Sequence, residues 1–181
     1  MSLYVGSEMV AAPYGAAQRS AAGRVAARRA LAGCDGPEML LGRTELGAPI
    51  FPAGFSGSIS HTETIAISVV CREKRLIGID IENRPPAPEV DRFLLQTDAE
   101  REIASDPQVG RIGVWVAKEA AFKALHRQRD LHGGIFLRLR LTRESDNELG
   151  VQNDTNGLRI FVASAVTSAA ALAISDTVSD C

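Results

Sequence analysis

The sequence predicts an α+β fold: a pseudo-two-fold pair of similar α+β half-domains, each an antiparallel sheet packed on one long helix. Two alanine-rich stretches, residues 16–33 and 110–126, repeat small and apolar side chains at helical spacing. Short apolar runs bounded by polar turns have the pattern of strands. The segment SGSISHTETIAISVV at 56–70 is echoed by LRIFVASAVTSAAALAIS at 158–175, which suggests that the two halves have a similar construction.

The first half starts with the helix predicted at 16–33, which Gly33 ends in the manner typical of helix C-termini. A turn-rich loop is expected at 47–57, because glycine and proline interrupt any regular structure there. Three strands follow, each a short apolar run next to a polar turn. They are expected at residues 57–60, 65–71 and 76–82.

The stretch NRPPAPE at 83–89 cannot continue a strand, because proline lacks the N–H group that a sheet needs. It is the predicted linker between an N-terminal half, residues 1–82, and a C-terminal half, residues 90–181. After its long helix, the second half is expected to form a half-buried strand at 135–142 and two short strands within 158–175.

The composition of the 181-residue chain is that of a globular protein, with 45% hydrophobic and 23% charged residues. The net charge of −2 gives no reason to expect a nucleic acid partner. Cys34, Cys71 and Cys181 form no metal or disulfide pattern, which fits a reducing compartment. The N-terminus lacks the features of a signal peptide, and no run approaches the length of a membrane span. A cytoplasmic protein without a membrane partner is therefore expected.

Two acids, Asp80 and Glu82, lie one residue apart in the apolar run LIGIDIE. Alternate residues of a strand point to opposite faces, so both carboxylates share one face while Ile79 and Ile81 share the other. Like charges this close repel each other and lose hydration on burial, so a cation is expected to compensate them. That cation is a metal such as Mg²⁺ or a lysine. The alternative is an exposed edge strand on which charge prevents aggregation.

The helix at 110–126 carries Glu119 and Lys123, which are four residues apart and therefore neighbours on one face. Most such pairs are exposed ion pairs that stabilise a helix very little. This pair lies beside Trp115, the single tryptophan, and Phe122. An aromatic rim is more typical of the edge of a site than of a solvated face. Glu119 would then be a third carboxylate for the same ion.

Groups that suit phosphate binding occur in two other places. The turn GSISHTE supplies hydroxyl groups, including that of Ser60, a glycine that admits backbone N–H groups, and His61 as an adjustable donor. Arg19, Arg24 and Arg28 give the first helix a basic side, and arginine is suited to bidentate phosphate contacts. A solvated turn and a solvated helix face are the respective alternatives.

In their chain order these motifs resemble the 4′-phosphopantetheinyl transferases, in particular the monomeric, two-half kind that activates siderophore and peptide synthetases, such as the enterobactin synthase component D type. The matching residues are GAPIFPAGFSGSISHTE, GIDIE and WVAKEAAFKA, and the helix RSAAGRVAARRAL is similar to the family's N-terminal one. The combination of GIDIE with a later W-x-x-K-E-A-x-x-K is highly specific. The resemblance implies that the phosphopantetheine arm of coenzyme A is transferred to a serine of an acyl or peptidyl carrier protein, with release of 3′,5′-ADP.

The resemblance also implies a role for the acidic residues. Asp80, Glu82 and Glu119 would hold Mg²⁺ on the coenzyme A pyrophosphate, and Glu119 would help to remove the serine proton. Lys123 would neutralise the phosphate that departs with ADP. The catalytic residues implied are Glu119, Lys123 and His61.

Coenzyme A, the co-substrate, would be bound by basic and hydroxyl side chains. The residues implied are Arg19, Ser20, Arg24, Arg28, Ser60, His61 and Lys123. The chain departs from the family at Ala48, where relatives often carry lysine, and in residues 1–18, which contain no lysine or arginine. Binding is therefore expected to depend on the arginines of the first helix, together with Arg43.

The segment 123–143 is strongly basic, with Asp130 as its single acid. Carrier proteins of this family are generally acidic around the modified serine, so the segment is expected to supply part of their docking face. An ordinary solvated face is the alternative. Three other interpretations of the chain stay open: a non-catalytic module that binds Mg²⁺ and a nucleotide, a structural domain, and a member of the small trimeric holo-synthase subgroup.

Overall fold

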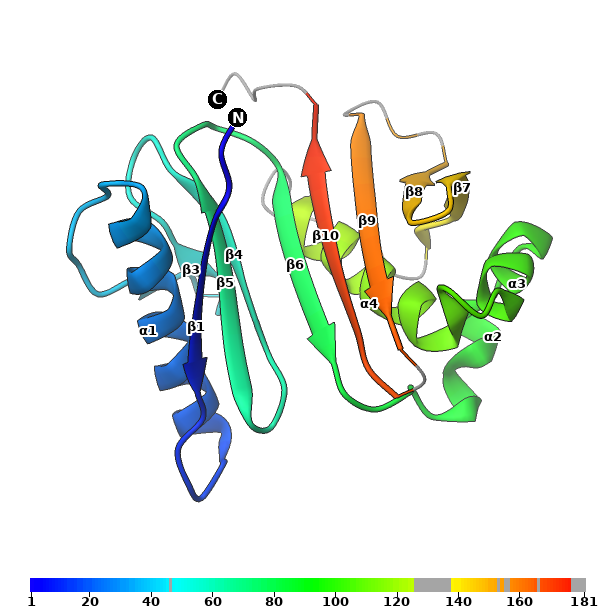
Figure 1. The fold of residues 1–181 in the computed structure, drawn as a ribbon, viewed down its shortest axis with the longest axis horizontal. Coiled ribbons are helices and arrows are strands. Elements are labelled where there is room, and N and C mark those ends of the chain that lie inside the picture. The colour runs from blue at the N-terminus through cyan, green and yellow to red at the C-terminus, as the bar shows by residue number, and fades with distance from the viewer. Residues whose placement is uncertain (46, 126–137, 153, 155–156, 166, 177–181) are drawn as a thin grey trace. The chain divides into compact units, whose positions relative to one another are not determined.

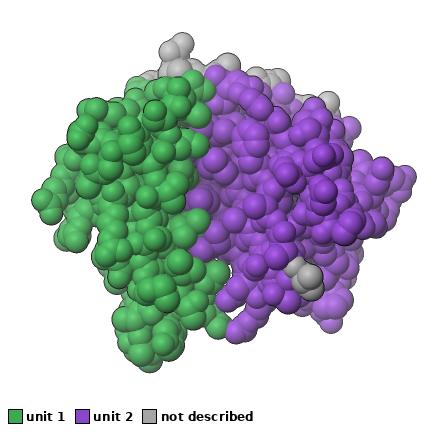
Figure 2. All heavy atoms as spheres, in the orientation of Figure 1, with its two compact units in different colours: residues 1–75, 178–181 green, residues 76–177 purple. Residues whose placement is uncertain are grey.

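The computed structural model describes the chain except residues 46, 126–137, 153, 155–156, 166 and 177–181 (Figure 1). The protein is α+β, with antiparallel sheets and a few helices. It divides into two compact units, which Figure 2 shows in different colours. Unit 1 contains residues 1–75, and unit 2 contains Leu76–Thr177. No helix in the described part of the chain combines the length and the apolar character needed to cross a membrane.

Unit 1 is a three-stranded antiparallel sheet of order β1-β5-β4 with one long helix packed on it. Its elements are β1 (Tyr4–Met9), α1 (Ala16–Gly33), β4 (Ser56–His61) and β5 (Ile65–Cys71), and the small pair β2 (Gly42–Arg43) and β3 (Pro49–Ile50). The helix α1 and the two strands β4 and β5 were expected from the sequence. Strand β1 was not expected, because its exposed side carries the apolar Val5 and Met9 while its inward side carries Gly6 and the acidic Glu8, so its hydrophobic pattern does not follow its burial.

Helix α1 lies directly on β1, because the residues that meet there are small. A Cβ atom added at Gly6 would be 2.1 Å from the carbonyl oxygen of Ala26, so any side chain at this position would separate the helix from the strand. On the helix, Ala26, Ala27 and Ala30 are buried. The alanines of the predicted helix therefore form the surface by which it packs on the sheet.

Unit 2 is a five-stranded antiparallel sheet of order β6-β10-β9-β8-β7, covered by α4. The strands are β6 (Ile77–Glu82), β7 (Leu141–Ser145), β8 (Glu148–Val151), β9 (Leu158–Ser164) and β10 (Ala169–Ser175). The helices are η1 (Pro88–Val90), α2 (Asp91–Leu94), α3 (Asp98–Ser105) and α4 (Gly110–Leu125). Within this unit, β6 is separated in the sequence from its partner β10 by all the helices.

Helix α4 meets β6 in the same way as α1 meets β1. A Cβ atom at Gly78 would be 2.0 Å from the carbonyl oxygen of Ala120. The predicted alanine side of α4, including Ala117 and Ala124, is fully buried. In each unit the first strand, β1 or β6, pairs with the last, β5 or β10, which pairs in turn with the strand before it. The two units therefore repeat one topology.

The division between the units falls between Arg75 and Leu76, earlier than the predicted end of the first half at residue 82. The reason is that β6 pairs with β10 and so belongs to the second sheet. The predicted linker at 83–89 therefore lies inside unit 2, where the Arg111 guanidinium donates to the carbonyl oxygens of Pro86 (2.9 Å) and Ala87 (3.1 Å). Of the strand expected at 135–142, residues 135–137 lie outside the described residues, and 138–140 are not in a strand, so the expectation is wrong there; strand β7 begins only at Leu141.

Candidate active site

Strand β6 presents Asp80 and Glu82 on the face that α4 covers. Gly78, the point of contact with α4, precedes them on the same face, because alternate residues of a strand point the same way. Asp80 is only 4% exposed, while Glu82 is half-buried. Asp80 and Glu82 share one face of β6, as the sequence predicted. For that reason both carboxyl groups lie on the side of the strand that α4 covers.

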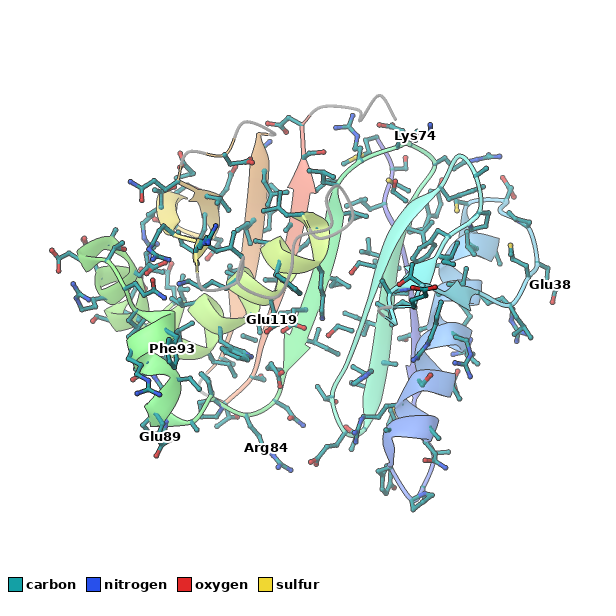
Figure 3. All side chains as sticks on the ribbon, turned by 180° about the vertical axis from the view of Figure 1, so that it is seen from behind. Glu38, Lys74, Arg84, Glu89, Phe93 and Glu119 are labelled. Carbon is teal, nitrogen blue, oxygen red and sulfur yellow. The ribbon has the colours of Figure 1, made fainter. Side chains whose placement is uncertain are left out.

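Helix α4 presents Trp115, Glu119 and Lys123 to this strand, one stripe at intervals of four residues. The Lys123 ammonium is 2.6 Å from Asp80 Oδ1, and its Nζ donates to the carbonyl oxygen of Ile79 at 3.2 Å. The side chain of Trp115 interacts with the carboxyl group of Glu82 and lowers its pKa. Glu119 lies half-buried between these two residues along the helix (Figure 3). Lysine thus supplies a cation that the acidic strand was expected to need.

Burial and neighbouring negative charges raise the pKa values of Glu119 and Glu82. Burial raises the pKa of Glu119, the negative charges of Asp80 and Glu82 raise it further, and Lys123 opposes them. Burial also raises the pKa of Glu82, with the charge of Asp80 adding to it and the side chain of Trp115 opposing it. One lysine therefore leaves the cluster with an excess of negative charge.

Hard carboxylate oxygens are the donors that Mg²⁺ prefers, so the chemistry of this cluster fits the expected ion. The present side-chain positions do not complete a ligand set: among the described residues, no three His, Cys, Asp or Glu side chains form a group that could hold a metal. The contact of Lys123 with Asp80 Oδ1 would have to open for that oxygen to bind an ion. In their present positions the described side chains therefore do not form a metal site, and a metal role for these carboxylates stays a prediction.

Unit 1 has a cavity of about 240 Å³ whose walls are basic. Three arginines line it, together with a serine and a histidine: Arg19, Arg24, Arg43, Ser20 and His61. Ser20 is the shared contact, because its Oγ accepts from Arg24 at 2.8 Å and from Arg43. Guanidinium groups held side by side in this way suit an anionic ligand such as a phosphate.

Two of the coenzyme A contacts predicted within unit 1 do not line this cavity. Ser60 is buried on the face of β4 opposite to His61, since the two are neighbours along the strand. Arg28 lines a second cavity of about 240 Å³, shared with Arg29 and Glu38, one helical turn after Arg24 on α1. The predicted coenzyme A contacts of unit 1 therefore do not all line one cavity. Arg43, on β2, lines the first cavity together with Arg19, Ser20 and Arg24.

Most of the basic segment that was expected to bind a carrier protein, residues 126–137, lies outside the described residues. Of the rest, Arg138 is exposed, and Arg143 forms an ion pair of 2.7 Å with Asp106. Lys118, which the sequence analysis used only as a letter of the motif, is fully buried beside Glu100. No sequence pattern pairs these two, because they belong to different helices.

Two comparisons with known proteins match the chain to one family. The model of the 4′-phosphopantetheinyl transferase N-terminal domain matches residues 17–71, and that of the 4′-phosphopantetheinyl transferase superfamily matches residues 76–174. The 4′-phosphopantetheinyl transferase Npt of Nocardia iowensis is 36% identical over 107 residues, which are 56% of this chain and 48% of that protein. The chain spans about half the length of this curated relative.

The second match holds every residue of the acidic cluster, on β6 and on α4, and the first holds the whole arginine-lined cavity. The superfamily match alone extends over more than half of the chain. On this agreement of sequence and geometry, the chain belongs to the 4′-phosphopantetheinyl transferase superfamily.

Proposed function

We propose that this protein transfers the 4′-phosphopantetheine arm of coenzyme A to a serine hydroxyl of an acyl or peptidyl carrier protein, in an Mg²⁺-dependent reaction that releases 3′,5′-ADP. The observation that carries the proposal is the cluster of Asp80, Glu82 and Glu119 with Lys123, within the region that matches the superfamily. The name of the Nocardia iowensis relative, a 4′-phosphopantetheinyl transferase, supports the same activity.

In this proposal Asp80, Glu82 and Glu119 are the Mg²⁺ ligands. A bound Mg²⁺ would supply charge neutralisation on the coenzyme A pyrophosphate, which is the main requirement of phosphoryl transfer. The side chain of Trp115 interacts with the carboxyl group of Glu82 and so limits the directions in which that ligand points.

The bond changes assign the remaining roles. The serine oxygen forms a bond to the phosphorus that carries the pantetheine arm, and the bond from that phosphorus to the bridging oxygen breaks. The serine proton passes to Glu119, whose raised pKa suits it to accept a proton. The electron pair stays on the departing oxygen of 3′,5′-ADP, and Lys123, released from Asp80, neutralises it.

The basic cavity of unit 1 is proposed to take a phosphate of coenzyme A. Arg19, Arg24 and Arg43 would supply charge, and His61 would donate a hydrogen bond and so hold the substrate for reaction. Ser60 is proposed to contribute through its backbone, because its side chain is on the other face of β4. Arg28 would make a more distant contact from the second cavity.

We also propose that the halves form a pseudo-two-fold pair in a cytoplasmic monomer, of the kind that serves siderophore or peptide synthetases. The repeated topology of the two units supports this arrangement over the trimeric subgroup. The basic segment 123–143 would face the acidic surface of the carrier protein.

The deciding experiment is a mass measurement on apo carrier proteins of the fatty-acid, polyketide and peptide types. With coenzyme A, Mg²⁺ and this protein, one of them should gain a single arm of about 340 Da on its serine. The gain should disappear with EDTA and with the Glu119→Gln variant. If coenzyme A binds with Mg²⁺ but no carrier protein is modified, the non-catalytic binding module is the better interpretation.

A further inference from the structure

Glu100 and Lys118 form an ion pair in unit 2 that the proposed chemistry does not use. Both side chains are 0% exposed, and Lys118 Nζ lies 2.8 Å from Glu100 Oε1. The same Nζ donates to the carbonyl oxygen of Leu94 at 2.7 Å. Lys118 thus links α4 to the end of α2 and to α3.

The carboxylate of Glu100 accepts three further hydrogen bonds, all from backbone N–H groups. Oε2 accepts from Gln96 (2.8 Å) and Thr97 (3.1 Å), which makes Glu100 part of the capping box of α3. Oε1 accepts from Leu141, the first residue of β7, at 3.0 Å. Burial would raise the pKa of Glu100, but the hydrogen bonds from Lys118 and from the backbone lower it, so the pair is ionic.

The pair holds α4 from a direction different from that of the sheet. On the sheet side, the contact of Gly78 with Ala120 sets how closely the helix approaches β6. Such a stripe of small residues leaves rotation and sliding of the helix poorly defined. Lys118, on another side, can reach Glu100 and Leu94 in one orientation of the helix only.

The residue after Lys118 is Glu119. In a helix of 3.6 residues per turn, neighbouring side chains move together when the helix turns about its axis. A rotation that broke the ion pair would therefore also turn Trp115, Glu119 and Lys123 away from Asp80 and Glu82. Buried ion pairs seldom stabilise a protein more than apolar residues of the same size, so their use is better explained by the single arrangement they impose.

We propose that Glu100 and Lys118 are positioning residues, whose buried ion pair sets the rotation of α4 and thereby aims Trp115, Glu119 and Lys123 at the acids of β6. The catalytic consequence rests on the proposed function, whereas the positional one does not. Trp115 is the single tryptophan and its side chain interacts with Glu82, so its emission reports on that position.

The test compares Lys118→Met with Ile103→Ala. Ile103 lies on α3 in the same core, is 1% exposed and takes no part in the ion pair, so its truncation is a control for loss of stability. Three quantities are measured on each full-length variant: Tm, the emission spectrum of Trp115, and the Kd for Mn²⁺ without coenzyme A, by electron paramagnetic resonance.

For Lys118→Met we expect a shifted Trp115 emission and a Kd for Mn²⁺ raised about tenfold, the usual size of effect for residues that orient metal ligands. Ile103→Ala should change neither, even with an equal or larger fall in Tm. In transfer assays, Lys118→Met should lower kcat and leave KM for coenzyme A unchanged. Lys118→Arg, which keeps the charge, should recover part of the Mn²⁺ affinity.

The proposal is overturned if folded Lys118→Met keeps the wild-type emission and Mn²⁺ affinity, or if Ile103→Ala alters both to the same extent. Should Lys118→Met not fold, Glu100→Asp is judged by the same two readouts, since it keeps the charge and shortens the side chain by one methylene. Neither readout needs the transfer reaction. A wild-type protein that modifies no carrier protein would therefore refute the proposed function and leave this inference to be decided separately.

Discussion

In unit 1, helix α1 makes its close contact with strand β1 at Gly6. In unit 2, helix α4 makes the same kind of contact with strand β6 at Gly78. Two residues after each glycine is an acid, Glu8 or Asp80, which forms an ion pair with a cation on the helix. That cation, Arg29 in unit 1 and Lys123 in unit 2, immediately precedes the second alanine of the close contact. The two units thus repeat a contact and an ion pair, position for position.

The difference lies around these pairs. Glu82 is four residues after the contact glycine of unit 2, and the matching residue in unit 1 is Val10. Glu119 immediately precedes the first contact alanine, and the matching residue in unit 1 is Val25. The pair of unit 1 is also more open, with its arginine 58% exposed and its acid 28%, against 28% and 5% in unit 2. The acid–cation pair therefore belongs to the repeated scaffold, and the two added carboxylates distinguish the candidate active site.

The sharpest test of this distinction removes one of the added carboxylates. Glu119→Gln should lower the transfer rate at least about a hundredfold, because it removes the proposed proton acceptor and metal ligand. The matched change in unit 1, Val25→Ala, should leave the rate within about twofold of wild type. The measurement is the initial rate of carrier-protein modification. Equal effects of the two variants would mean that Glu119 has no special role.

Alanine at either contact glycine should be the next largest effect. A Cβ atom at Gly78 or Gly6 would overlap a helix carbonyl, so each variant should lose about 3 kcal/mol of folding stability or more in urea unfolding. Only Gly78→Ala should also reduce Mn²⁺ affinity in the fraction that remains folded, since it displaces α4 from the acids. Loss of affinity in Gly6→Ala as well would contradict the assignment of the metal site to unit 2.

Removing the cation of the ion pair should reduce the folding stability of the protein more in unit 2 than in unit 1. Lys123→Met leaves Asp80 as a buried carboxylate without its lysine and should destabilise the metal-free protein by about 2 kcal/mol. Arg29→Met opens an exposed pair and should cost about 0.5 kcal/mol. Unfolding curves in EDTA measure both. Added Mg²⁺ should restore stability to Lys123→Met and not to Arg29→Met, because a ligand stabilises the state that binds it.

A fourth prediction, on stability alone, concerns acid and the Glu100–Lys118 pair. The lowered pKa of Glu100 means that its contribution to stability is present above the pKa of an unfolded glutamate and is lost as the pH falls through the lower folded value. At neutral pH, Glu100→Gln should be less stable than wild type by about 2 kcal/mol. The difference in the free energy of unfolding between wild type and Glu100→Gln should narrow as the pH falls below about 4. If urea unfolding gave the same difference in stability between the two proteins down to about pH 2, ionisation of Glu100 would not contribute to folding stability.

Features that depend on neighbouring residues were predictable from the sequence. The bounds of α1 and α4 follow from alanine and apolar spacing, and the shared face of Asp80 and Glu82 follows from the alternation of a strand. The same alternation separates Ser60 from His61, which the sequence analysis had grouped as one phosphate site. The separation of these two side chains therefore follows from a local rule of strand geometry.

Features that depend on contacts between distant segments were not predictable. The pairing of β6 with β10 moved the boundary between the units, and the β2–β3 pair brought Arg43 to Ser20. The capping box Thr97-x-x-Glu100 can be recognised in the sequence, yet nothing there indicates that Lys118 completes it.

By itself, then, the sequence determined the two long helices α1 and α4, the strands β4, β5, β6, β9 and β10, and the family whose motifs they carry, because spacing along a chain dictates which side chains share a face. Only the tertiary structure decided that Lys123 forms an ion pair with Asp80 and that Arg28 lines a different cavity from Arg19 and Arg24. It also decided that Lys118, the residue before Glu119, forms a buried ion pair with Glu100. Those outcomes follow from the packing of helices on sheets, which joins residues whose separation in the sequence carries no signal.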